Sequence, residues 1–411
     1  MKRFLNKYQL ADIIFAGLAF ISFFFISEYF GSAMLGEYGY YNIISNYIWL
    51  FTSMGFQKYI PTVLLNDTEI EIKKFLNSLR TYFIILASII ISIALILFVL
   101  GLIESKLFMS ILFGMTTSLL LEPLFQYFKA TNNDKRYFKL RVYSGLVIFL
   151  SLIMVYNFNL SQKLLNLYAL LFIFTLTLYI VFKPNIYFSF ELDNVFKYLK
   201  KSSPLVIHSI SLTILIGFDR IILKEIIGFE NLGKYILTYQ VFSIINMYNQ
   251  GFNKSITHLY KSKTNISIIK QKFNFNILLI ISFCVLIIPF MFLLNMLNIN
   301  VMIDQEILVL LSLIMLWQSY YTFNSNDISL FQKKPQRLIK ASIPAAFICV
   351  ILCYLLIPVL GVLGALIATM FGYLTLAILT FKMAIFLKSN KNTILILCSI
   401  SLILSLIFLI N

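Results

Sequence analysis

Two lysines lie deep within apolar segments, and their surroundings are alike. Lys58 belongs to "MGFQKYIPTV" (54–63), and Lys254 belongs to "QGFNKSITHL" (250–259). A charged side chain inside a membrane helix costs about 2.5–3.5 kcal/mol on insertion scales and usually marks a transport pathway. Lysine binds phosphate as a compact point charge. The two lysines are therefore a candidate site for a pyrophosphate group; the alternative is that each ammonium snorkels to the lipid headgroups.

Three other ionisable residues lie in or beside apolar segments. His258 follows Lys254 by one helical turn, and His208 lies near the start of another apolar segment. Histidines at such positions could couple transport to protons, although a structural or interfacial role is the stronger reading for each. Glu122 is the most deeply placed carboxylate, and it could pair with a cation or carry a coupling ion.

Asp219 and Arg220 are adjacent in "FDRIIL". They could form an ion pair that holds or gates the outer mouth of a pathway, or they could be ordinary charges of an outer loop. Asp12 and Glu28 bracket the first apolar segment and are expected near the headgroups. No spacing of cysteines or histidines suggests a metal site, so neither a metal nor a cofactor is predicted.

Composition places the chain among helical membrane proteins. Of its 411 residues 60% are hydrophobic and only 12% are charged, and apolar runs long enough to cross the hydrocarbon core as helices recur throughout. The first of these runs lacks a small-residue cleavage site and is interpreted as a retained helix rather than a signal peptide. We expect spans at about 10–31, 39–65, 79–102, 106–128, 138–157, 163–183, 203–224, 233–259, 274–297, 303–325, 340–358, 362–387 and 393–410.

The net charge of +16 reflects topology rather than nucleic-acid binding. When the loops are assigned to alternate sides of the membrane, 28 of the 33 Lys and Arg residues fall on the side of the N-terminus. The positive-inside rule then predicts a cytoplasmic N-terminus. The same cations are expected to attract anionic lipids, and no nucleic-acid partner is predicted.

The chain contains two similar halves. "LGEYGYYNIISNYIWLFTSMGFQK" begins at Leu35, and "LGKYILTYQVFSIINMYNQGFNK" begins at Leu232. Between the halves, residues 183–202 are expected to form an interfacial helix. Both halves begin on the inside, so they are predicted to be parallel repeats with a substrate site between them. The expected fold is an all-α polytopic membrane protein with two six-helix lobes related by a pseudo-two-fold axis along the membrane normal. The expected domains are 1–190, 191–390 and a possible extra transmembrane helix within 391–411.

The stretch "GFENLGKY" (228–235) imitates a nucleotide-binding loop. It has the spacing G-x-x-x-x-G-K but ends in Tyr rather than Ser or Thr, and it follows no strand. A P-loop needs both features to place phosphates and Mg²⁺. ATP hydrolysis is therefore not expected, and ions, the membrane potential or the substrate gradient would have to drive transport.

Three stretches resemble the Wzx-type polysaccharide flippases of the MOP superfamily: residues 33–64, residues 218–260 and "LIPVLGVLGALIATMFGYL" (356–374). The resemblance implies a MATE-like fold and, at 219–220, an Asp-Arg pair of that family. It also implies export of undecaprenyl-pyrophosphate-linked oligosaccharide, destined for O-antigen, capsule or another surface polysaccharide, across the bacterial cytoplasmic membrane. Polysaccharide polymerase machinery is an implied partner. A thirteenth span departs from the twelve or fourteen that are common in the family.

Two alternatives stay open. A MATE-type antiporter of small molecules would share the fold, but it would favour acidic residues in its cavity, and this chain is richer in membrane-embedded cations. A membrane enzyme of polysaccharide assembly would need a sizeable outer or catalytic loop, whereas the longest expected outer loop has roughly ten residues.

Overall fold

The computed structural model is helical throughout the residues that it describes. These are residues 7–52, 69–122, 124–125, 128, 133–158, 162–182, 200, 202–256, 266–297, 301–302 and 304–385. Within them, nine helices are long and apolar enough to cross a membrane. The chain is therefore a multi-pass membrane protein, as predicted. The predicted span 393–410 lies outside the described residues, as does most of the predicted interfacial helix at 183–202.

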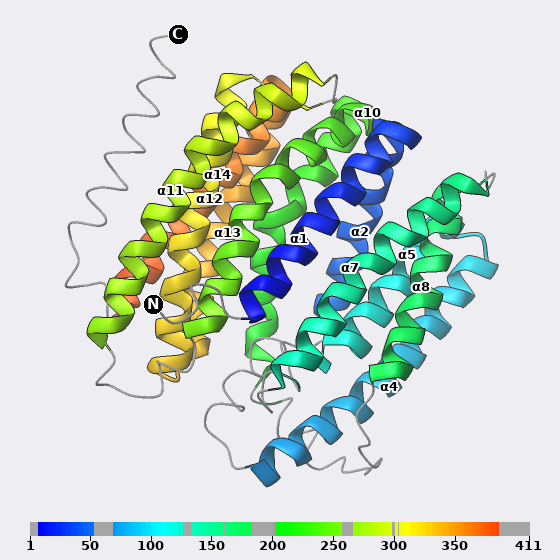
Figure 1. Ribbon diagram of the computed structural model, residues 1–411, viewed down its shortest axis with the longest axis horizontal. Helices are drawn as coiled ribbons and strands as arrows, with labels where there is room; N and C mark the ends of the chain where they lie inside the picture. The colour runs from blue at the N-terminus through cyan, green and yellow to red at the C-terminus, as the bar shows by residue number, and fades with distance from the viewer. Residues whose placement is uncertain are drawn as a thin grey trace. The chain divides into compact units, whose positions relative to one another are not determined.

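Counting α10 as two segments, six described helices precede residue 183 and six follow it (Figure 1). The first six are α1 (Lys7–Phe25, extended by the π-turn η1, Ile26–Phe30), α2 (Ser32–Thr52), α4 (Glu69–Val99), α5 (Ser105–Thr116, extended by the π-turn η2, Thr117–Leu121), α7 (Asp134–Asn157) and α8 (Lys163–Phe182). The others are α10 (Pro204–Ile256), α11 (Ile266–Met296), α12 (Gln305–Asn326, followed by the π-turn η5, Asp327–Phe331, and the 3₁₀ turn η6, Pro335–Leu338), α13 (Ile339–Leu360) and α14 (Val362–Met383).

Single glycines replace two of the loops that the hydropathy pattern predicts. Gly228 has φ 72° and ψ 177° inside α10, so the helices expected at 203–224 and 233–259 adjoin with only this residue breaking the helix. Gly31 has φ 91° and separates η1 from α2. Glycine adopts positive φ at no steric cost, so it can redirect the chain within one residue. As a result α2 begins at Ser32, seven residues before the predicted start at 39.

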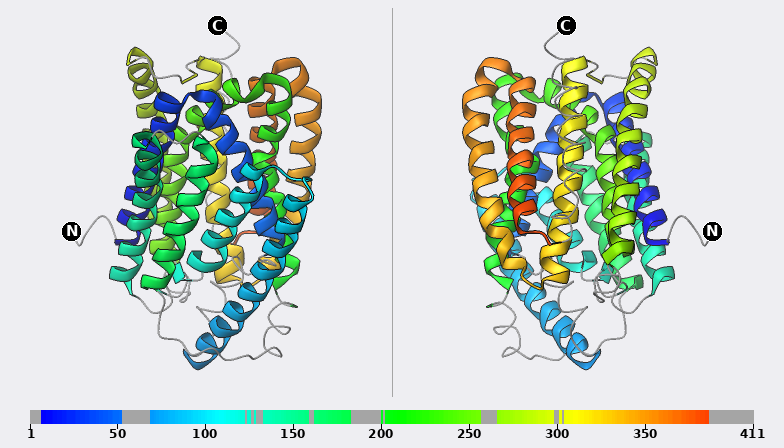
Figure 2. Two further views of the ribbon diagram at one scale, coloured as in Figure 1. Left: turned by 90° about the vertical axis from the view of Figure 1, so that its right-hand side faces the viewer. Right: turned by 90° about the vertical axis from the view of Figure 1, so that its left-hand side faces the viewer.

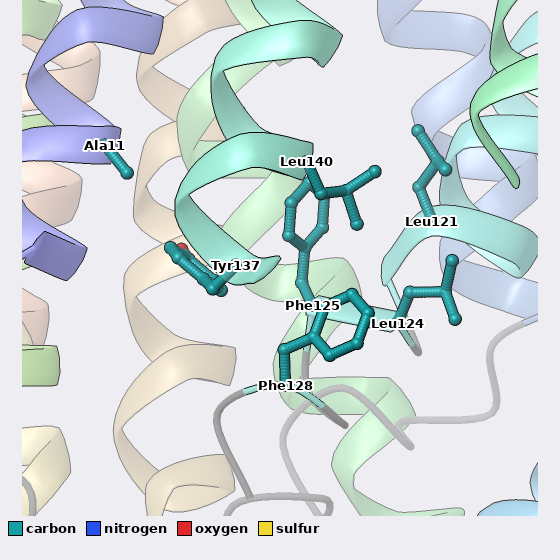
Figure 3. Close-up of a cluster of buried hydrophobic side chains, with 7 residues drawn as sticks. All are labelled: Ala11, Leu121, Leu124, Phe125, Phe128, Tyr137 and Leu140. Atoms are coloured by element: carbon teal, nitrogen blue, oxygen red, sulfur yellow. The ribbon is translucent and has the colours of Figure 1, made fainter. Parts of the chain in front are cut away.

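The chain divides into two compact units, residues 1–29 with 37–210 and residues 30–36 with 211–411. In the first unit α1 packs along α7, and α8 packs along both α5 and α7 (Figure 1). The α1–α7 interface ends in an apolar cluster, shown in Figure 3, whose members are Ala11, Leu121, Leu124, Phe125, Phe128, Tyr137 and Leu140. The Tyr137 side chain extends toward the side on which Ala11 lies (Figure 3).

Small polar residues bring α2 and α5 close together in the first unit. The Ser45 hydroxyl donates to the Ser110 carbonyl at 3.0 Å, and the Ser110 hydroxyl donates to the Tyr41 carbonyl at 3.0 Å. A Cβ atom on Gly114 would overlap the Ser45 side chain. Small residues at helix contacts allow this close approach, which compensates for the weak hydrophobic drive between helices in lipid.

In the second unit α14 packs against both α13 and α12 (Figure 2). Helix α12, with the turn that follows it, is the most enclosed of the described spans, because 83% of its most apolar stretch is buried in the protein. It is also the least apolar of the nine, because a helix surrounded by protein rather than lipid can carry polar side chains that bond to its neighbours.

Candidate functional site

The paired lysines fall largely outside the described residues. Lys58 and His258 belong to the parts of the chain that the structure does not describe, and Lys254 lies in the last turn of α10, with its backbone described and its side chain not. Their proposed roles as a receptor for pyrophosphate therefore stay predictions.

The helix turn before Lys254 carries a buried network of asparagines. Asn253 donates to the Asn249 carbonyl at 2.8 Å, and Asn276 of α11 donates to the Asn249 side chain at 2.9 Å. Asn326 of α12 donates to the Asn253 side chain at 3.0 Å. Asn249, Asn253 and Asn276 are each at most 4% exposed. The network joins three helices of the second unit and holds the backbone at the "GFNK" motif.

A buried charged cluster lies between α1 and α7 in the first unit. Asp12 is 3% exposed, and its carboxylate accepts from Arg141 Nε and from the Tyr137 hydroxyl, both at 3.1 Å. The Arg141 guanidinium lies 3.7 Å from the centre of the Phe15 ring and 5.3 Å from that of Phe125. Paired charges and a cation–π contact offset much of the cost of removing these ions from water.

A cavity of about 220 Å³ opens beside this cluster. Glu122 and Arg141 supply its charge, and phenylalanines supply much of its wall. The lining residues are Phe15, Phe113, Thr117, Leu121, Glu122, Phe125, Arg141, Ser144, Val147, Ile148, Thr175 and Leu178. The structure thus places Glu122, which we singled out from the sequence, in the lining of the same cavity as Arg141.

Sequence reasoning missed the importance of Asp12 and Arg141. Asp12 was expected near the headgroups, and Arg141 counted only as one more inner-side cation. The two residues are 129 positions apart, so no local pattern joins them. The spacing of Tyr137 and Arg141 was the available signal, because residues four apart lie on one helix face.

Asp219 and Arg220 have different partners in the second unit. Asp219 is 2% exposed, and its carboxylate accepts from the Tyr235 hydroxyl at 2.5 Å and from the Arg220 backbone N–H at 2.8 Å. The Arg220 guanidinium instead lies 5.0 Å from the centre of the Tyr239 ring. The two residues therefore help to join the halves of α10 on either side of Gly228.

His208 and Asp327 are further buried polar residues in the second half of the chain. His208 is fully buried in the first part of α10. Asp327, which the sequence did not single out, is also fully buried, and it accepts from the Ile385 backbone N–H at 2.7 Å and from Gln332 at 3.4 Å. Asp327 thereby ties the end of α12 to the segment after α14. Among the residues described, no cluster of three or more potential metal ligands occurs.

Comparison with known proteins identifies the fold. No family model matches the chain, and no curated protein matches it. Among solved structures, the MATE multidrug transporter DinF-BH in complex with rhodamine 6G has a TM-score of 0.67 and 14% identity over 94% of each chain. A MOP superfamily transporter from Pyrococcus furiosus, described as having a binding pocket of reverse polarity, has a TM-score of 0.63 and 12% identity, with 92% of this chain and 93% of that chain covered.

A mutant of the Vibrio cholerae MATE transporter VcmN has a TM-score of 0.62 and 12% identity, with 94% of this chain and 95% of that chain covered. At such low identity these similarities concern the fold alone.

Proposed function

The chain has the MATE-type fold of the MOP superfamily transporters over more than nine-tenths of its length, and from that premise we propose that it is a secondary transporter. We further propose that its substrate is an undecaprenyl-pyrophosphate-linked oligosaccharide, moved from the inner to the outer leaflet of the bacterial cytoplasmic membrane by alternating access. The N-terminus would then lie in the cytoplasm, and the exported unit would pass to polysaccharide polymerase machinery.

The observation that carries the substrate proposal is the pairing of the buried carboxylates. Asp12, Asp219 and Asp327 are the buried acids of the described residues, and each already accepts two hydrogen bonds from neighbours within the protein. A transporter of organic cations needs a carboxylate that is available to its substrate. Buried carboxylates that are satisfied internally favour a neutral or anionic substrate instead.

Cationic side chains would then receive the pyrophosphate. Lys58 and Lys254 occupy matching places in the two repeats, and two ammonium groups suit a doubly charged diphosphate. His258, one turn beyond Lys254, and Arg220, whose guanidinium lies on an aromatic ring, are proposed as further contacts. Asp219, Glu122 and His208 are proposed to gate the pathway or to couple it to ions.

The direct test is flipping of the lipid-linked oligosaccharide. In cells that lack this protein, we expect the oligosaccharide to accumulate on the inner leaflet, and we expect the wild-type chain to restore export. Replacing Lys58 and Lys254 together with Gln should abolish that restoration, whereas replacement with Arg should retain most of it. Lys272→Gln, at an exposed lysine of α11, is the matched control and should behave as wild type.

Undiminished export by the Lys58→Gln/Lys254→Gln protein, at equal abundance in the membrane, would refute the lysine receptor. Export that does not depend on the chain at all would refute the flippase proposal.

An ion-coupled antiporter of small molecules is the second candidate. The cavity lined by Arg141 and Glu122 in the first unit supports it, because a space with one acid, one base and three phenylalanines could hold part of a small organic molecule. Rhodamine 6G, the ligand in the DinF-BH structure, can serve as the test substrate for this second candidate. If the chain is a flippase, reconstituted vesicles should not transport this dye under a proton or sodium gradient; gradient-dependent transport of the dye would favour the antiporter.

A further inference from the structure

The stretch that imitates a P-loop is one copy of a motif that occurs twice. "GSAMLGEY" (31–38) and "GFENLGKY" (228–235) share the pattern G-x-x-x-L-G-x-Y. Each copy lies where one helix gives way to the next, before α2 in one case and at the break of α10 in the other. The two copies are therefore equivalent in structure as well as in sequence.

The first glycine of each copy redirects the chain. Gly31 has φ 91° and Gly228 has φ 72°, and a Cβ atom at either position would meet nothing within 4 Å. Their requirement for glycine is therefore conformational, because L-residues with side chains rarely adopt such φ values.

The second glycine of each copy packs against the other copy. A Cβ atom on Gly36 would overlap the carbonyl of Phe229 and come within 3.1 Å of the Gly233 nitrogen. A Cβ atom on Gly233 would overlap the carbonyl of Ser32 and come within 3.1 Å of the Gly36 nitrogen. Ser32 and Phe229 each lie four residues before the glycine of their own copy, so the contact is reciprocal, backbone against backbone.

The residues that follow Gly36 attach the rest of α2 to the first unit. Residues 30–36 belong to the second unit, and α2 continues into the first unit from Glu37. There Glu37 pairs with Lys106 of α5 at 2.8 Å, and the Tyr38 ring stacks on Tyr168 of α8 with ring centres 5.6 Å apart. One helix thus has its first turn against α10 and its remainder anchored to α5 and α8.

We propose that the crossing of Gly36 and Gly233, both of which belong to the second unit, is the outer gate of the transport cycle and opens when the two helices part. By the predicted topology, both copies of the motif lie at the outer face. A backbone contact suits a gate because no side chains interlock across it. Close approach supplies dispersion and weak Cα–H···O attraction, and such a contact can separate and form again without repacking.

The gate is tested by distance measurements that need no substrate. Spin labels would be placed at Ala33→Cys and Asn231→Cys, two exposed positions on the crossing helices, after replacement of the four native cysteines. In lipid nanodiscs the wild-type sequence should give mainly a short distance. Gly36→Ala and Gly233→Ala should each shift the population to a distinct longer distance, because a methyl group prevents close approach.

Gly17→Ala is the matched control, since a Cβ atom on this glycine of α1 meets nothing within 4 Å, and it should leave the distances unchanged. Populations in Gly36→Ala and Gly233→Ala that equal those of Gly17→Ala would overturn the proposal. A broadened short distance without a separate longer one would also overturn it, because that result indicates a static contact that has merely loosened.

If the alanine variants do not fold, the wild-type sequence decides the question in proteoliposomes. A longer distance should appear under an imposed proton or sodium gradient, and a single short distance under every gradient would overturn the gate. The proposal rests on the chain being a transporter and not on the identity of its substrate. Failure of the flipping assay above would leave it intact.

Discussion

At the scale of single residues, the clearest feature is the ion pair of Asp12 and Arg141. Both side chains are largely buried, with exposures of 3% and 23%, and Tyr137 completes the hydrogen bonding of the carboxylate. Removing one partner of such a pair leaves an uncompensated charge, which costs more than the net contribution of the intact pair. Asp12 and Arg141 therefore bear on stability whatever the function of the chain.

We predict that Arg141→Gln lowers the free energy of unfolding by about 3 kcal/mol, measured by thermal denaturation in detergent. Lys7→Gln is the control, because Lys7 joins the same two helices through Asp134 at 2.8 Å but both side chains are about 40% exposed. Its effect should stay below about 1 kcal/mol. Equal effects of the two substitutions would contradict the account of the buried pair.

A second replacement tests whether the loss of stability comes from the unpaired carboxylate of Asp12. Adding Asp12→Asn to Arg141→Gln should recover part of the lost stability, because the carboxylate that Arg141 paired is then replaced by a neutral amide. Two additive losses would mean that the residues act independently.

At the scale of elements, glycines decide where the helices end. Gly228 divides a 53-residue helix into two spans, and Gly31 separates the first span from the second. In both places the break occupies one residue, so hydropathy, which averages over many residues, cannot locate it. The Asp219–Tyr235 hydrogen bond then joins the two segments of α10 across its break.

Opposite effects are expected for alanine at two glycines without close neighbours. Gly228→Ala should destabilise the protein by about 1–2 kcal/mol, because alanine is strained at positive φ. Gly17→Ala should be neutral or stabilising by up to about 1 kcal/mol, because Gly17 lies inside α1 and alanine favours helix. Thermal denaturation of both variants measures the difference, and a loss at Gly17 as large as at Gly228 would contradict this explanation.

At the scale of the whole molecule, charge asymmetry predicts the orientation. Five of the 33 Lys and Arg residues are assigned to the outer side, and such a bias sets how a membrane protein inserts. The same assignment of loops predicts that the two repeats begin on the same side of the membrane.

Cysteines at two exposed positions test this topology. Asn231→Cys, between the halves of α10, should react in intact cells with a thiol reagent that cannot cross the membrane. Lys334→Cys, after α12, should react only once the cells are permeabilised. The reverse pattern would show that the N-terminus lies outside.

The sequence by itself determined the membrane class and the helical fold, and it predicts the repeat and the direction of insertion. These properties depend on hydropathy, charge and local similarity, which are sums over neighbouring residues. The sequence also singled out Glu122 and the adjacent residues Asp219 and Arg220, because a charge within an apolar run is conspicuous. The lysine receptor and the lipid-linked substrate remain predictions.

Only the tertiary structure decided which distant groups meet. Asp12 reaches Arg141 across 129 positions, and Gly36 meets Gly233 because two helices cross there. Hydropathy cannot distinguish a charge that is paired inside the protein from one at the headgroups, nor a glycine in a close contact from one such as Gly17 that touches nothing. The difference lies in the packing of helices against one another, and that packing depends on the whole chain.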